Sequence, residues 1–141
     1  MKRVILLFVV LVASVVFGQQ SASPAQPPDF EQKKTAVNLL RLINTAEMNY
    51  RSEKGRFANF QQLVEANLLS PQSTHIRIAM WPTGFNPANL KEPISGLALT
   101  LSPSVDGESY QVAVLTTKQN TELWGFYSTQ DGLILAMLPI R

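Results

Sequence analysis

Hydrophobic positions follow a helical period in the first half of the chain and an alternating period in the second. From about Phe30 to Lys54, apolar residues recur every three or four positions, which is typical of an amphipathic helix. At roughly 100° per residue, one face holds six residues that we expect to be buried: Ala36, Leu39, Leu40, Ile43, Ala46 and Tyr50. Val37 and Met48 lie together on one flank of this face, and Leu42 lies on the other.

Helix-ending signals bound this segment and a shorter one after it. Asp29 can cap the first turn, with Gln32 three residues later as in a capping box, and Gly55 supplies a stop. A short second helix is predicted between Asn59, which begins a similar box, and Pro71.

From Leu97 onward the period changes to two, which predicts strands. Turn signals occur at Asp106-Gly107 and Asp131-Gly132. The four predicted strands fall within residues 97–101, 110–114, 123–128 and 133–138. Consecutive strands with short links pair most simply as an antiparallel meander. The expected fold class is α+β: a long N-terminal helix and a short second helix packed on a four-stranded antiparallel β-meander.

Residues 70–95 are predicted to form an irregular loop that contains several prolines and glycines. A loop of this length is unusual in a compact domain unless it is functional or packed by its own aromatic residues. We expect Trp81 and Phe85 to hold it against the core.

The start of the chain predicts export. Residues 1–18 combine Lys2 and Arg3 with a short apolar run that ends at Gly18, as in a secretory signal peptide. Residues 19–28 are rich in Pro, Ser and Gln and are expected to be a disordered linker. Residues 29–141 then form a single domain, located in the periplasm or outside the cell. The alternative is that the apolar run is kept as a membrane anchor.

Charge and cysteine content limit the classes of partner and of chemistry that we expect. Lys2 and Arg3 are two of the 12 basic residues, so the exported part is neutral against its 10 acidic residues. Nucleic-acid binding needs a clustered positive surface, so we expect no nucleic-acid partner. The chain has no cysteine, which excludes disulfides, thiol catalysis and a lipid-modified cysteine terminus. We therefore expect no stable membrane anchor after cleavage.

Two segments carry a resemblance to a known family. NLLRLINTAEMNYRSEKGRFANFQQLVEANLL has a long helix ending in an aromatic, a glycine turn, an aromatic and a short Leu-rich helix. YSTQDGLI has an aromatic strand, a polar turn and an apolar strand. In this order they resemble the globular part of type IV pilin-like and pseudopilin-like proteins, roughly from Ala36 to Ala136. The resemblance implies a pilin-like fold, although the proline-rich loop around TGFNP is not part of that pattern.

The leader departs from this family. Pilins have a short basic leader cut after a glycine, and their apolar segment stays on the mature protein with a glutamate near its start. Here the apolar run precedes the expected cut, no glutamate stands in or beside it, and Gln19 begins a polar linker. The resemblance therefore implies the fold, while the leader argues against ordinary pilus assembly.

Few residues suggest catalysis or metal binding. His75 has no partner acid or nucleophile at a recognisable spacing, and no second histidine marks a metal site. Asp106 and Asp131 precede glycines and are expected to be turn residues. Glu47 is expected to pair with Arg51 one helical turn away. We therefore expect no catalytic, cofactor-binding or metal-binding residues, and no cofactor.

Aromatic and flanking apolar residues are the better candidates for function. Exposed aromatics rimmed by polar residues are a usual contact surface. The candidate interaction surface comprises Val37, Met48, Trp81, Phe85, Trp124 and Tyr127. The leading hypothesis is an exported, non-enzymatic pilin-like protein that binds another protein and does not polymerise as a standard pilin. The alternatives are a pilin or pseudopilin subunit with a retained anchor, and a small hydrolase or small-ligand binder using the loop at 70–95.

Overall fold

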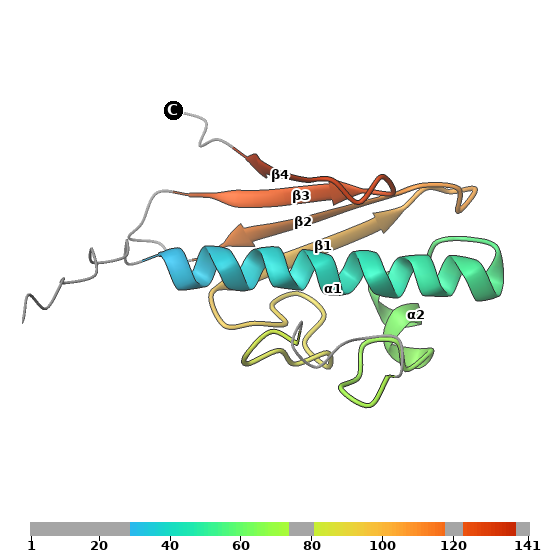
Figure 1. Ribbon diagram of the computed structural model, residues 1–141, viewed down its shortest axis with the longest axis horizontal. Coiled ribbons are helices and arrows are strands. Elements are labelled where there is room, and N and C mark those ends of the chain that lie inside the picture. The colour runs from blue at the N-terminus through green and yellow to red at the C-terminus, as the bar shows by residue number, and fades with distance from the viewer. Residues whose placement is uncertain (1–28, 74–80, 118–122, 138–141) are drawn as a thin grey trace, which may run out of the picture.

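A computed structural model of the chain describes residues 29–73, 81–117 and 123–137. They form an α+β fold with two helices and one four-stranded antiparallel sheet (Figure 1). The elements in chain order are α1 (Phe30–Lys54), α2 (Phe60–Glu65), β1 (Leu97–Pro103), β2 (Tyr110–Thr116), β3 (Gly125–Thr129) and β4 (Ile134–Met137). This confirms the predicted fold class with one correction: the long helix begins at residue 30 and is not at the N-terminus of the chain. The expected signal peptide and linker lie outside the described residues.

The predicted C-terminal end of α1 is confirmed, and the predicted N-terminal capping box is not. Gly55 adopts a left-handed conformation (φ 74°) and its N–H donates to the Arg51 carbonyl, so the predicted stop is confirmed. The predicted capping box at the start is wrong. The Asp29 side chain makes no capping bond and instead pairs with Lys33 at 2.5 Å, while Gln32 donates its side-chain amide to the Gly96 carbonyl at 3.1 Å.

The buried face of α1 is wider than a single stripe. All six residues of the predicted face are buried, and so are Leu42 and Glu47. The core therefore wraps around the Leu42 side of the helix, whereas Met48 on the opposite flank is 52% exposed. Neither described helix combines the length and apolar character that crossing a membrane requires.

The sheet is a meander in which every strand is antiparallel to its neighbour, in the order β1-β2-β3-β4. Helix α1 packs on one face of it, against β2 and β3. We call this the inner face, and its buried residues are Leu97, Leu99, Tyr110, Val112, Val114, Thr116, Trp124 and Ser128. Because side chains alternate along a strand, the remaining strand residues point to the opposite, outer face.

Helix α2 and the segment 81–96 lie beyond β1, at the lower side of Figure 1. The predicted capping box of α2 is confirmed, because Asn59 and Gln62 each accept the other's backbone N–H at 2.9 Å. Trp81 contacts Phe85 edge-on with ring centroids 5.1 Å apart, and Phe85 contacts Phe60 of α2 at 6.5 Å. These contacts confirm that Trp81 and Phe85 hold the loop on the core.

Candidate interaction surface

The structure divides the six predicted surface residues among three places. Val37 and Met48 lie on α1, Trp81 and Phe85 lie in the loop beyond β1, and Trp124 and Tyr127 lie on opposite faces of the sheet. The six residues therefore do not form one surface.

Trp124 belongs to the core. Its side chain is only 9% exposed, lies on the inner face and contacts Phe126 at 5.8 Å. The Lys33 ammonium of α1 lies 5.7 Å from the indole centroid, a cation–π distance. The indole N–H is buried and has no hydrogen-bond partner in the described part of the chain. Trp124 is thus positioned to stabilise the contact between α1 and β3, not to meet a partner.

The loop aromatics are also largely committed to packing. Trp81 and Phe85 are both partly buried against the core cluster and against each other. His75 belongs to the segment 74–80, which is outside the described residues. The structure gives Trp81 and Phe85 a packing role whether or not they also contact a partner.

The α1 flank is exposed but isolated. One turn of helix before and after Met48, the neighbours on the same side are Asn44, Thr45, Arg51 and Ser52, all polar. Val37 is partly buried. Single apolar side chains in polar surroundings are common on protein surfaces and carry no functional implication.

Tyr127, by contrast, lies in a continuous apolar surface on the outer face. The strand register places it directly between Ala113 of β2 and Leu135 of β4. Tyr127 is 38% exposed, and Leu135 and Leu115 are 39% and 45% exposed. Residues directly opposite each other on adjacent strands have Cβ atoms about 4.5–5.5 Å apart, so Tyr127 and Leu135 are side-chain neighbours.

Gly125 lies on the same face, directly between Leu115 of β2 and Met137 of β4. A Cβ atom built on Gly125 would lie 2.5 Å from a Leu115 methyl and 3.0 Å from the terminal carbon of Met137. The side chains of Leu115 and Met137 therefore close over Gly125 from both neighbouring strands. We use the name outer apolar face for this set: Ala113, Leu115, Gly125, Tyr127, Leu135 and Met137.

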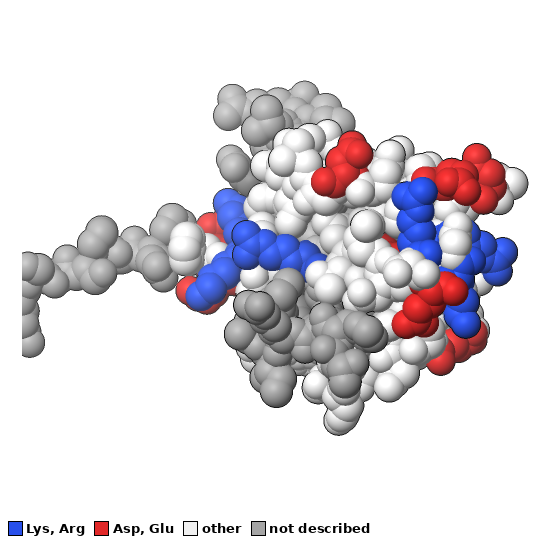
Figure 2. All heavy atoms as spheres, turned by 45° about the vertical axis from the view of Figure 1, so that its right-hand side comes forward, with Lys and Arg blue, Asp and Glu red and all other residues white. Residues whose placement is uncertain are grey.

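The outer apolar face contains no charged residue, and neither does any other position of β1 to β4. Elsewhere on the molecule charges of both signs are mixed. Figure 2 shows Lys and Arg side chains beside Asp and Glu at both ends of the visible face. Ion pairs among the described residues join Lys33 to Asp29, Lys34 to Glu31, and Arg51 to Glu108. The outer apolar face is distinguished by its lack of charge.

Sequence reasoning found Tyr127 but missed its neighbours Leu115 and Leu135. Leu123 and Leu133, which are also strongly exposed, extend the apolar character along the ends of β3 and β4. A signal was present in the sequence: leucine and alanine occupy alternate strand positions that would normally be polar on a solvated sheet.

Glu47 is a buried acid with an unexpected partner. It does not pair with Arg51, as the spacing predicted; Arg51 instead reaches Glu108 at 3.5 Å. The Glu47 Oε2 atom accepts the backbone N–H of Ala58 at 2.9 Å, and Oε1 is buried without a partner in the described residues. Burial raises the pKa of Glu47 to about 7, against the lowering effect of the Ala58 N–H. The buried hydrogen bond from the Ala58 N–H to Glu47 holds the turn between α1 and α2 against the helix.

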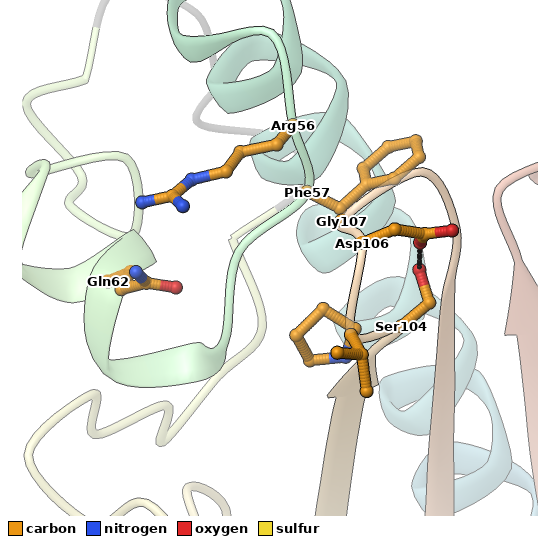
Figure 3. A pocket seen from close by; sticks show the side chains of 8 residues that line it. Arg56, Phe57, Gln62, Ser104, Asp106 and Gly107 are labelled. Carbon is orange, nitrogen blue, oxygen red and sulfur yellow. Dashed lines mark hydrogen bonds between the residues drawn. The ribbon is translucent and has the colours of Figure 1, made fainter.

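A shallow pocket of about 140 Å³ lies where this turn meets the β1–β2 turn (Figure 3). Arg56 and Gln62 line one side, and the turn from Ser104 to Gly107 lines the other. The Asp106 carboxylate accepts hydrogen bonds within its own turn, from the Ser104 hydroxyl at 2.6 Å and from the Glu108 N–H at 3.0 Å. The Ser104 hydroxyl, followed by the Glu108 N–H, lowers the pKa of Asp106. The pocket does not involve the loop at 81–95.

Both predicted aspartate turns are confirmed. Gly107 and Gly132, which follow Asp106 and Asp131, have φ values of 74° and 71°. In the described residues, His, Asp and Glu do not gather in a group of three or more that could hold a metal ion.

Comparisons of the chain with known protein families, with curated proteins and with solved structures found no match.

Proposed function

We propose that the chain is an exported, non-enzymatic protein with a pilin-like fold that acts by binding another protein through its outer apolar face. The observation that carries this proposal is the uncharged and exposed group formed by Leu115, Tyr127 and Leu135 on three adjacent strands. A sheet face of this kind is usually covered, and α1 covers only the inner face.

The pilin-like part of the proposal is supported by the order of elements. A long helix ends at a glycine, a short helix follows, and a closing hairpin of β3 and β4 ends the described chain. This is the order on which the sequence resemblance rests. The export part is supported by the basic and apolar character of residues 1–18.

We expect a photo-crosslinking amino acid at position 127 to form a covalent adduct with a protein partner in the producing cells. The same amino acid at position 48 serves as the matched control, since Met48 is at least as exposed but has polar neighbours. Adducts are measured by mass spectrometry after irradiation, with circular dichroism confirming that both variants fold. Equal adducts at both positions, or none at position 127, would contradict the proposed role of the outer apolar face.

A further inference from the structure

The two edges of the sheet differ in how they are covered. At the β1 edge, the Leu97 N–H donates to the Ile94 carbonyl at 2.9 Å and the Leu99 N–H donates to the Lys91 carbonyl at 3.0 Å. The strand then ends at Pro103, which has no N–H. The segment 91–96 therefore takes up the outward N–H groups of Leu97 and Leu99, and Pro103 has none to offer a further strand.

The β4 edge is open. Among the described residues no element lies beyond β4, which forms the upper border of the sheet in Figure 1. β4 is short, with four residues, but it contains no proline and no charged residue, two other features with which proteins protect an exposed edge strand. An edge of this kind is suited to accept another strand.

The register shows which β4 groups point outward. In an antiparallel pair, residues that exchange hydrogen bonds alternate with residues whose backbone groups point away from the partner strand. The Leu99 N–H points away from β2, and the Thr116 N–H points to the Trp124 carbonyl. Carried across β3, this alternation directs the N–H and C=O groups of Ile134 and Ala136 toward the open edge.

We propose that the partner at this edge is a second copy of the chain, and that the two β4 strands pair antiparallel about a two-fold axis at Leu135. This inference rests on the proposed binding role of the outer apolar face and names a partner at its β4 border, where Leu135 lies; Tyr127 and Leu115 stay on the joined surface. Ile134 of each copy exchanges hydrogen bonds with Ala136 of the other, so all four outward groups of each strand are satisfied.

The pairing joins the two outer apolar faces into one surface. Leu135 lies opposite Leu135 of the second copy as a pair without mutual hydrogen bonds, with Cα atoms about 4.5 Å apart. Both side chains point to the outer face, where each already lies beside Tyr127 of its own copy. The contact therefore removes an exposed leucine from water and extends the sheet to eight strands.

Charge and edge coverage favour a second copy over a longer assembly. An uncharged strand meets its own copy without repulsion between like charges, and a two-fold contact needs the same patch on both molecules. Because Leu97 and Leu99 already donate their outward N–H groups and Pro103 has none, the β1 edge of either copy is poorly suited to a third molecule. The assembly stops at two.

A single introduced cysteine tests the pairing, because the chain has none of its own. Leu135→Cys places two thiols across the two-fold axis at a separation that a disulfide spans. Leu115→Cys is the matched control, because its side chain is exposed on the same face but two strands further from the edge. Five strand spacings, about 24 Å, then separate the two Leu115→Cys thiols.

With the purified exported chain under mild oxidation, we expect Leu135→Cys to become a covalent dimer and Leu115→Cys to remain a monomer on a non-reducing gel. Crosslinking of Leu115→Cys without Leu135→Cys would show that the copies meet face to face and would overturn the inference. Equal slow crosslinking of both would also overturn it, since that is the result of random collision.

Backbone variants at the edge give an independent result. Ala136→Pro removes one outward N–H without breaking a bond to β3, whereas Ala136→Ser keeps that N–H. By sedimentation equilibrium, we expect the original chain and Ala136→Ser to be dimers and Ala136→Pro to be a monomer. A monomeric original chain, or a dimeric Ala136→Pro, would contradict pairing through β4.

The crosslinks from position 127 separate this inference from the function on which it rests. An adduct of twice the chain mass supports the second copy. An adduct with a different protein, together with a monomeric purified chain, overturns the second copy and leaves the binding role standing. Absence of any adduct contradicts both.

Discussion

Replacing Glu47 by glutamine is expected to stabilise the protein at about pH 8 by about 3 kcal/mol and to have little effect near pH 4. Burial raises the pKa of this carboxyl from the ordinary 4.5 to about 7 in the folded state. Between these two values the folded chain keeps a proton that the unfolded chain has lost. The contribution of Glu47 to stability is therefore complete below about 4.5 and is lost as the pH rises to about 7.

The measurement is the free energy of unfolding in urea as a function of pH, for the original chain and for Glu47→Gln. The difference between the two curves isolates this one group, because all other titrating residues are shared. Glu53→Gln is the control, since Glu53 is an exposed acid on the same helix. Parallel curves for the original chain and Glu47→Gln would contradict the raised pKa.

Trp124→Ala is expected to destabilise the protein by about 3–5 kcal/mol, the usual cost of removing a large aromatic side chain from a core. The indole ring fills the space between α1 and β3, where it contacts Phe126 and lies under Lys33. Tyr127→Ala, one residue away on the outer face, is expected to cost less than about 1 kcal/mol. The midpoint of urea unfolding, followed by circular dichroism, measures both.

Trp124→Phe gives a further comparison. Phenylalanine keeps much of the ring packing and removes the buried indole N–H that has no partner in the described structure. Its cost should therefore be well below that of Trp124→Ala. Similar losses for Trp124→Ala and Tyr127→Ala would mean that both residues are in the core and that the outer face is not a free surface.

Most of the fold could be predicted because its signals are local. The left-handed turn at Gly55, the capping box of Asn59 and Gln62, and the glycines at 107 and 132 depend on residues a few positions apart. The alternation of leucine and valine in β1 and β2 likewise reports directly on the two faces of a strand.

The two side-chain predictions that were wrong, for Gln32 and Glu47, failed because both residues contact parts of the chain outside their own helix. Gln32 does not cap α1, because it reaches a carbonyl 64 residues away at Gly96. Glu47 does not pair with Arg51, because the chain after Gly55 turns back and offers it the Ala58 N–H. Neither partner can be seen from helical spacing.

The candidate surface was only partly predictable for a similar reason. Aromatic residues were visible in the sequence, but which of them α1 buries depends on how the helix lies across the sheet. Leu115 and Leu135 look like ordinary strand residues until the register places them beside Tyr127. Their exposure is a property of the assembled sheet.

The mass of the chain recovered from outside the cytoplasm tests the account most directly. We predict a protein that has lost about its first 18 residues and begins near Gln19, found free of the membrane. Such a protein would carry the helix-on-sheet domain without an apolar anchor and would depend on its exposed sheet for contacts. Recovery of the intact 141-residue chain in the membrane fraction would contradict this account and favour a pilin subunit with a retained anchor.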